Sequence, residues 1–406
     1  MPRNPGLTIT IPPAKLPDID SQSLGKLSAG SAGFFKFSPL PTFSAFSPFP
    51  GLEVQGLSLK VIRLIEEQLC KIDCSVKHLE DKVGEGSEGD VFICQFEDWV
   101  FARKIVRPSS GELAIHQFLS SRRNFNPELI VPCLGIRENA IYMPYYLSGS
   151  LTGYMPFIKE ALACGDEGEE LLAFIYLITQ LKNVAKALQI LHGDLEKDGF
   201  MHGDLCPDNL LLDNEANWVV ADFGCVQRAS KAAASGQAIG RKAYLAPEVI
   251  LQIKGYDYRF SDLWSLGVLL TFLLQDKPVT YRAVVDFEDE DDYQAIEELA
   301  RSYISDEGCE RATIICRQLE KELLICRRHL TTIPPRLVLE YLRWLLLLPD
   351  MAGRISVDSL IEILEAVPVP DYDERAYARF IQRLQTSKQD FAREETRTPR
   401  EVLAIR

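Results

Sequence analysis

A glycine-rich turn between two strand-like segments constrains the fold of this chain more than any other feature. The runs "VKHLEDKVGEG", "GDVFICQFED" and "DWVFARKIV" have the alternation and composition of three β-strands. Gly84, Gly86 and Gly89 lie at the junction of the first two runs, just before Val91. A Gly-x-Gly-x-x-Gly series that binds a dinucleotide leads from a strand into a helix, so this strand-to-strand arrangement excludes that type of site. It predicts instead a flap whose backbone amides cover the phosphates of a nucleotide.

The third strand carries a lysine in the segment "VFARK". The spacing predicts that Lys104 reaches the phosphates under the flap and that Ala102, two residues earlier, faces the base. A single lysine on a strand is more often a solvated charge at a sheet edge. The order of the glycines, Val91 and Lys104 favours a phosphate ligand.

The tetrapeptide His-Gly-Asp-Leu occurs twice, at residues 192–195 and 202–205. Residues 170–192 have the periodicity of a buried helix that ends at the first copy. The second copy continues as "HGDLCPDNLLLD" and is followed by "VVADFG". A general base needs a metal ligand at a fixed spacing in a tight loop, and only Asp204 has such neighbours, in Asn209 and Asp222. We therefore assign the chemistry to the second copy.

These motifs resemble those of the eukaryotic protein kinase family. The segment "GELAIHQFL" resembles the start of the regulatory helix, which implies that Glu112 pairs with Lys104; the alternative is a glutamate favoured only by the helix dipole. The segment "AIYMPYYLSGSL" resembles the hinge, which implies Met143 as the gatekeeper and the backbone from residue 144 to Tyr146 beside adenine. The resemblance also assigns Leu211 to the nucleotide site.

Three downstream segments extend the resemblance to about residue 366. The segment "GRKAYLAPE" is similar to the end of the activation segment. The segment "SDLWSLGVLL" is similar to the central helix of the large lobe, which implies that Asp262 binds the backbone of the catalytic loop. The segment "LLLLPDMAGRIS" supplies Arg354, which in the family pairs with a glutamate, here Glu248.

The resemblance implies an α+β, bilobal protein-kinase fold with a small antiparallel-sheet N-lobe and a mostly helical C-lobe. It implies transfer of the γ-phosphoryl group of ATP to a protein hydroxyl, with Mg²⁺ as the second cofactor. Asp204 would orient and deprotonate the hydroxyl, while Asn209 and Asp222 would hold magnesium. Phosphoryl transfer needs little covalent help, so positioned charges and metals supply most of the acceleration. The segment "CPDN" favours serine or threonine over tyrosine as the acceptor.

The chain departs from the family in the catalytic loop and activation segment. Gly203 replaces the arginine before the catalytic aspartate, so phosphorylation of Ser230 or Ser235 is expected to matter little. Cys206 replaces the lysine that touches the transferring phosphate, and Arg241 replaces a threonine that meets this lysine. We hypothesise that the Arg241 guanidinium projects toward the space above Cys206 and supplies the missing catalytic charge. The alternative is an exposed arginine with no such role.

His116 stands where the family packs an apolar residue against Phe223. A neutral, hydrogen-bonded histidine costs little in a buried position. The first hypothesis for His116 is therefore a neutral, buried histidine. The second is that protonated His116 loosens the regulatory helix.

Composition predicts additional parts around the two lobes. Residues 1–50 are rich in Pro, Ser and Phe without a regular period, which predicts a disordered leader; its phenylalanines either dock to a partner or have no specific partner. The spacing in "LSLKVIRLIEEQLCKI" predicts an amphipathic helix over 57–72. The acidic run "DFEDEDD" is either a solvated face or attracts basic partners.

The predicted parts are 1–50 (leader), 51–78 (helical extension), 79–146 (N-lobe), 147–366 (C-lobe) and 367–406 (a charged, partly helical tail that either docks or stays mobile).

The formal net charge of −14 argues against a nucleic acid or an anionic membrane as the main partner. We expect a protein substrate, with basic proteins as one option. The most apolar helical stretches contain charges or are too short for a bilayer, so no membrane span is expected. The 10 cysteines form no Cys-x-x-Cys pairs. This favours reduced thiols and a cytoplasmic location, with the nucleus as the alternative.

Two other functions compete with an active protein kinase. A pseudokinase would act as a nucleotide-binding scaffold, but it would not require the base Asp204 that this chain retains. A small-molecule kinase of the aminoglycoside phosphotransferase type often has His-Gly-Asp in its catalytic loop. The segments "AYLAPE" and "DLWSLG" argue against this type, because they build the peptide-substrate surface of protein kinases.

Overall fold

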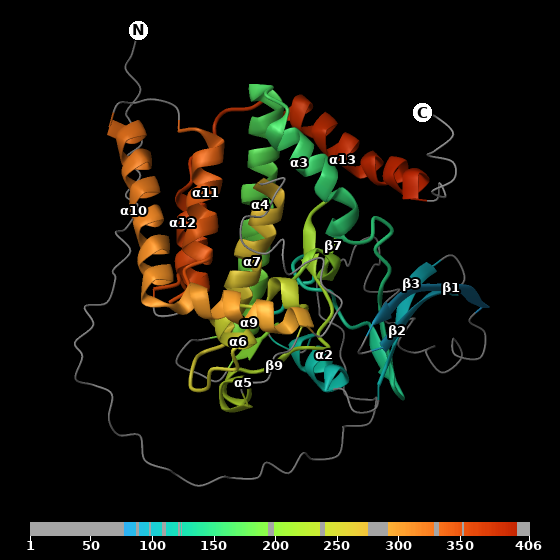
Figure 1. Cartoon of the computed structure of the whole chain (residues 1–406). Coiled ribbons are helices and arrows are strands. Elements are labelled where there is room, and N and C mark those ends of the chain that lie inside the picture. The colour runs from blue at the N-terminus through green and yellow to red at the C-terminus, as the bar shows by residue number, and fades with distance from the viewer. Residues whose placement is uncertain are drawn as a thin grey trace.

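The computed structural model describes residues 77–86, 89–96, 99–107, 111–120, 122, 124–193, 199–235, 240–274, 291–328, 333–350 and 353–395. The predicted leader and the predicted helix at 57–72 lie outside these residues, as do residues 286–290 of the acidic run. Figure 1 shows a small sheet at one end of the molecule and a larger group of helices at the other. The predicted small sheet lobe and mostly helical lobe are therefore confirmed.

The small lobe is built on a five-stranded sheet in the order β1-β2-β3-β5-β4. Its antiparallel hairpin joins β1 (Lys77–Gly86) to β2 (Gly89–Phe96), and β3 (Trp99–Val106) pairs with β2 and with β5 (Ala140–Pro144). Strand β4 (Gly135–Arg137) closes the edge beside β5. Helix α2 (Glu112–Ser120) follows β3 and buries His116 and Leu119. The three strands expected before residue 107 are thus present.

Helix α4 (Glu167–His192) is the centre of the large lobe. Asp166 caps its first turn by accepting hydrogen bonds from the amides of Gly168 and Glu169, and Gly193 ends it with a φ of 62°. Helices α3 (Met155–Ala163), α7 (Arg259–Leu274), α11 (Pro335–Leu346) and α12 (Val357–Ala366) share one apolar core with α4. Helix α10 (Asp306–Arg328) lies at the outer side of this group, and α9 (Asp291–Ile304) lies at its lower end (Figure 1).

Among the described helices, only α4 has the length and composition of a possible membrane span. Of its apolar window, 72% is buried inside the protein, as expected for a core helix. The prediction that this stretch is a buried core helix is confirmed.

Two short two-stranded sheets hold the loops that carry the predicted site residues. Strand β6 (Phe200–Met201) pairs with β9 (Gln227–Arg228), and β7 (Leu210–Leu212) pairs with β8 (Trp218–Val220). Asp204 and Asn209 lie between β6 and β7, while Asp222 lies between β8 and β9. The pairing therefore brings the two loops side by side. The chain then forms α5 (Ala229–Ser235) and α6 (Pro247–Ile250) before entering α7.

The tail contains a long helix, α13 (Glu374–Glu395), which packs against α3 and α4. In Figure 1 it runs from the top of α4 toward the side on which the sheet lies. Phe380 and Leu384 are fully buried in the core of the large lobe. Of the two alternatives for the tail, the structure shows the docked helix.

Candidate active site

Lys104 lies in β3 between two carboxylates. Its Nζ is 2.7 Å from Oε1 of Glu112 and 2.8 Å from Oδ1 of Asp222, and its side chain is 6% exposed. Burial lowers the pKa of Lys104, but the charges of Asp222 and Glu112 outweigh burial and raise the pKa overall. The ion pair expected between Lys104 and Glu112 is confirmed.

Glu112 is the first residue of α2, and it is almost completely buried. A glutamate at this position is favoured by the helix dipole, as the alternative explanation held. Its bond to Lys104 shows that it also joins α2 to the sheet. Both explanations therefore apply to the same residue.

Asp204 is held from both sides. Nδ2 of Asn209 donates to Oδ2 of Asp204 at 2.8 Å and to its backbone oxygen at 2.7 Å. The backbone N–H of Arg241 donates to Oδ1 at 2.8 Å. Since each carboxylate oxygen can accept more than one hydrogen bond, these contacts orient Asp204 and leave it able to accept from a further hydroxyl.

Asp222 has a φ of 60°, a conformation that is uncommon for residues other than glycine. Burial raises the pKa of its carboxyl group, but Lys104 lowers it by more, so the pKa lies below its usual value. The backbone N–H of Ala221, the preceding residue, donates to the carbonyl oxygen of Asn209 at 2.9 Å. This bond joins the Lys104–Asp222 pair to the loop that carries Asp204.

Phe223 packs between α2 and the catalytic loop. Its ring centroid is 4.8 Å from that of His116 and 5.9 Å from that of His202. Nε2 of His116 is 2.8 Å from the carbonyl oxygen of Val131, and burial lowers the pKa of His116 to about 4. The expected packing of His116 against Phe223 is confirmed, and the histidine is neutral at neutral pH.

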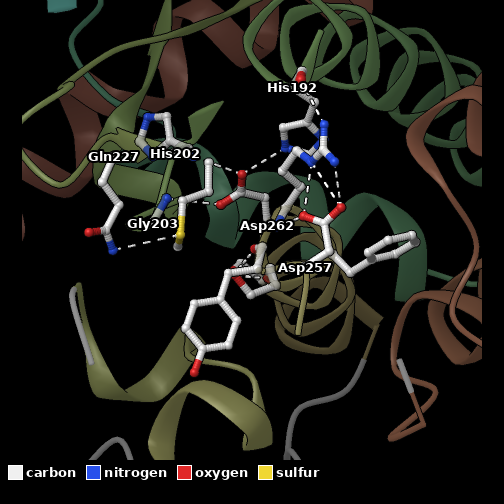
Figure 2. Close-up of polar contacts among 12 residues, drawn as sticks. His192, His202, Gly203, Gln227, Asp257 and Asp262 are labelled. Atoms are coloured by element: carbon white, nitrogen blue, oxygen red, sulfur yellow. Dashed lines mark hydrogen bonds and ion pairs between the residues drawn. The ribbon is translucent and has the colours of Figure 1, made fainter. Parts of the chain in front are cut away.

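Asp262 binds the backbone of the catalytic loop, as predicted. Its Oδ1 accepts from the amide of Gly203 at 2.9 Å, and its Oδ2 accepts from the amide of His202 at 2.8 Å. The same Oδ2 lies 2.8 Å from Nε2 of His192 (Figure 2). Nη1 of Arg259 also donates to the carbonyl oxygen of His192 at 3.2 Å. The first His-Gly-Asp-Leu copy therefore supplies a buried support for the loop that contains the second.

The residues assigned to the adenine site are connected by strand pairing and by one apolar cluster. Ala102 is paired with Met143 across β3 and β5. Met143 and Leu211 pack against a buried apolar cluster that contains Tyr146. The other members of this cluster are Val131, Val219 and Ala221.

The glycines assigned to the phosphate flap lie in the β1–β2 hairpin. Gly86 pairs with Gly89, Gly84 pairs with Val91, and Val91 pairs in turn with Lys104. The hairpin thus adjoins the strand that carries the lysine. The two residues of the turn itself, 87–88, lie outside the described residues.

Comparison with known proteins identifies the family. The sequence model of the family "Protein kinase domain" matches residues 77–362, which is more than half of the chain. The chain belongs to the protein kinase family. The pairing expected between Glu248 and Arg354 is present in this kinase domain, with Nη1 of Arg354 2.7 Å from Oε1 of Glu248.

Several curated kinases are similar to this one. A mitogen-activated protein kinase kinase, SIPKK, from Nicotiana tabacum is 28% identical over 280 residues, which cover 66% of this chain and 70% of that protein. A putative CBL-interacting protein kinase 27 from Oryza sativa subsp. japonica is 44% identical over 96 residues, 23% of this chain and 22% of that protein. The CBL-interacting serine/threonine-protein kinase 18 from Arabidopsis thaliana is 46% identical over 79 residues. These two matches span only 22% and 15% of the relatives' lengths.

The kinase departs from the expected arrangement at Arg241. Its guanidinium, which was expected above Cys206, pairs with the carboxylate of Asp208. Burial and the nearby carboxylate of Asp204 raise the pKa of the Cys206 thiol to about 12, while the charge of Arg241 acts in the opposite direction. The thiol is therefore neutral and supplies no charge in place of the lysine. The catalytic role of Arg241 stays a prediction.

Proposed function

We propose that this chain is an ATP-dependent protein kinase that transfers the γ-phosphoryl group of ATP to the hydroxyl of a protein serine or threonine. One observation carries the proposal. Asp222, which pairs with Lys104 of β3, lies on a loop adjacent to that of the Asp204–Asn209 pair, and the hydrogen bond from Ala221 to Asn209 joins the two loops. A cation, a positioned base and two oxygen donors are thus available at one place.

Each residue has a distinct task in this mechanism. Asp204, oriented by Asn209 and by the backbone of Arg241, accepts the proton of the acceptor hydroxyl. Lys104, held by Glu112, offers its charge to the phosphates. These groups are fixed before the reaction, so little reorganisation is needed during transfer.

The donor set fits magnesium. Nδ2 of Asn209 donates to Asp204. The side-chain oxygen Oδ1 of Asn209 is therefore available to a cation that also binds the carboxylate of Asp222. Carboxylate and carbonyl oxygens are ligands that Mg²⁺ accepts, with phosphates and water completing its shell. Asn209 and Asp222 would hold the ion, which would offset the negative charge of the phosphates. Within the described residues, no group of three or more His, Cys, Asp or Glu side chains could hold a metal ion.

Separate observations support serine or threonine as the acceptor residue and the cytoplasm as the location. The segment "CPDN" and the names of the relatives favour serine or threonine. The sequence has no Cys-x-x-Cys pairs, which supports reduced thiols and hence the cytoplasm, with the nucleus as the alternative.

The second candidate is a pseudokinase, because Cys206 carries no charge and Arg241 is paired elsewhere. A phosphate-transfer assay with ATP, Mg²⁺ and generic protein substrates separates the two, with the wild type beside Asp204→Asn. We expect transfer by the wild type and a loss of about 100-fold or more in the variant. Nucleotide-induced thermal stabilisation without transfer by either protein would support the pseudokinase.

A further inference from the structure

A second carboxylate lies close to the proposed base. Asp208 follows Cys206 in the same loop, in the single 3₁₀ turn Pro207–Asn209. Its side chain is 41% exposed. Oγ1 of Thr152, which follows the hinge, donates to its Oδ1. The carboxylate is therefore fixed in direction while one side of it faces solvent.

Arg241 connects this carboxylate to the base. Its backbone N–H binds Oδ1 of Asp204 at 2.8 Å, and its guanidinium pairs with Oδ2 of Asp208. Gly240 makes the approach possible, because it has a φ of 96° and a Cβ there would lie 2.2 Å from the carbonyl oxygen of Gly203. The backbone contact holds Arg241 in place, so the guanidinium reaches Asp208 at a small entropic cost.

The Arg241 guanidinium occupies the carboxylate of Asp208, to which a basic side chain of a substrate could otherwise bind. Two carboxylates beside an acceptor site attract a basic side chain of a bound peptide. Here the chain supplies that cation itself. Because the Arg241–Asp208 pair is partly exposed on both sides, with side-chain exposures of 48% and 41%, the competition is graded and the pair can be displaced.

We propose that Arg241 is a specificity-determining residue, whose ion pair with Asp208 fills the acidic site beside Asp204 and so disfavours substrates with Arg or Lys close to the acceptor hydroxyl. The inference rests on the proposed function and narrows its substrate class. A basic region elsewhere on a substrate is unaffected by it.

Two peptides test the inference, one with Arg flanking the acceptor serine and one with Gln at the same positions. The ratio of their kcat/KM values is compared between wild type and Arg241→Gln. We expect the ratio to shift about two- to fivefold toward the Arg peptide in the variant, the size expected for an exposed charge pair. Adding Asp208→Asn to Arg241→Gln should return the ratio close to that of the wild type.

Lys242→Gln is the matched control, because it removes a cation from the next exposed position of the same segment. An equal shift in Lys242→Gln, or a shift that persists in the double variant, would overturn the inference in favour of a general charge effect. An unchanged ratio in Arg241→Gln would also overturn it.

Binding of the same two peptides, labelled and measured by fluorescence anisotropy, gives a ratio that needs no catalysis. If no protein transfers phosphate, the proposed function fails, while the binding ratio still decides the inference. If phosphate is transferred and both ratios stay constant, only the inference fails.

Discussion

Nε2 of His192 lies 2.8 Å from Oδ2 of Asp262, and the same oxygen accepts the backbone N–H of His202 at 2.8 Å. A carboxylate only accepts hydrogen bonds, so the imidazole donates to it. The end of α4 and the start of α7 are thus joined at the catalytic loop (Figure 2). The loop that carries Asp204 depends on a contact between residues that are distant in the sequence.

Replacing His192 by Phe should weaken this support. The variant loses a buried hydrogen bond to a charged group, which is worth about 1.5–3 kcal/mol. We expect a lower free energy of unfolding in urea and a lower kcat, since the backbone of the catalytic loop is held less firmly. His192→Gln, which keeps an N–H donor, should lose less. Equal stability of wild type and His192→Phe would show that the bond contributes nothing.

Replacing Lys104 by Met should remove the cation between Glu112 and Asp222. Breaking a buried ion pair costs about 3–5 kcal/mol at neutral pH, and transfer activity should fall with nucleotide binding. Lys104 depresses the pKa of Asp222, so in the wild type the part of this stabilisation that comes from Asp222 is present at neutral pH and is lost as the pH falls from the ordinary value of 3.8 through the lowered pKa. The stability gap between the two proteins should therefore narrow as the pH falls below about 4.

Urea unfolding at pH 7.5 and at about pH 2.5, below the ordinary pKa of Asp222, measures this gap. The control is Lys186→Met, because Lys186 forms a largely exposed pair with Glu365. A gap for Lys104→Met that stays constant over this range would contradict the assignment of Lys104 to both carboxylates.

The contact between Asp204 and Asn209 in the second His-Gly-Asp-Leu copy is predictable from the sequence, because both residues lie in one loop at a short spacing. The small sheet is predictable for the same reason, since hairpins are local. The role of His192 is not predictable in this way, because its partner Asp262 lies 70 positions away. A histidine directly after the apolar residues Ile190 and Leu191 at the end of a buried helix is the available signal.

The position of the Arg241 side chain shows another limit. The sequence indicates a missing lysine at Cys206 and an unusual arginine nearby, which suggests that the two changes compensate. The backbone contact with Asp204 instead directs the guanidinium to Asp208, and this direction depends on how the activation segment folds back. Likewise the spacing in the tail indicates a helix, but not the surface that receives it.

Gly203 cannot be replaced freely by the arginine that its family has at this position. It has a φ of 82°, and a Cβ would lie 2.9 Å from the carbonyl oxygen of Cys225. Gly203→Ala should lower the free energy of unfolding by about 1–3 kcal/mol. Gly165 is a matched control, since it has a φ of 75° and a Cβ there would meet no atom within 4 Å. Equal costs for Gly203→Ala and Gly165→Ala would mean that the contact with Cys225 relaxes without penalty.

His116 should make the stability of the kinase depend on pH below 6.5. Burial lowers its pKa from 6.5 to about 4, so the unfolded chain binds a proton in this window that the folded protein does not. Stability is therefore unaffected above pH 7.5 and decreases as the pH falls toward 4, by up to about 3 kcal/mol. His116→Leu should remove this decrease. Parallel stability curves for the two proteins between pH 7.5 and 4.5 would contradict the lowered pKa.

Helix α13 should contribute to the stability of the large lobe through Phe380. This residue is completely buried, and its ring lies 5.4 Å from that of Phe157 and 6.1 Å from that of Tyr176. Phe380→Ala should cost about 3–5 kcal/mol in the free energy of unfolding. Arg379→Ala, at the neighbouring exposed position, should cost less than about 0.5 kcal/mol.

The same helix reaches the segment after the hinge, where Nζ of Lys388 donates to the carbonyl oxygen of Ser148 at 2.7 Å. Removing this bond should loosen the hinge rather than unfold the lobe. Lys388→Met should therefore raise the KM for ATP by about two- to fivefold with little change in the unfolding temperature, as expected for one partly buried hydrogen bond. An unchanged KM in Lys388→Met would show that α13 does not influence nucleotide binding. An unchanged unfolding temperature in Phe380→Ala would show that α13 does not stabilise the large lobe.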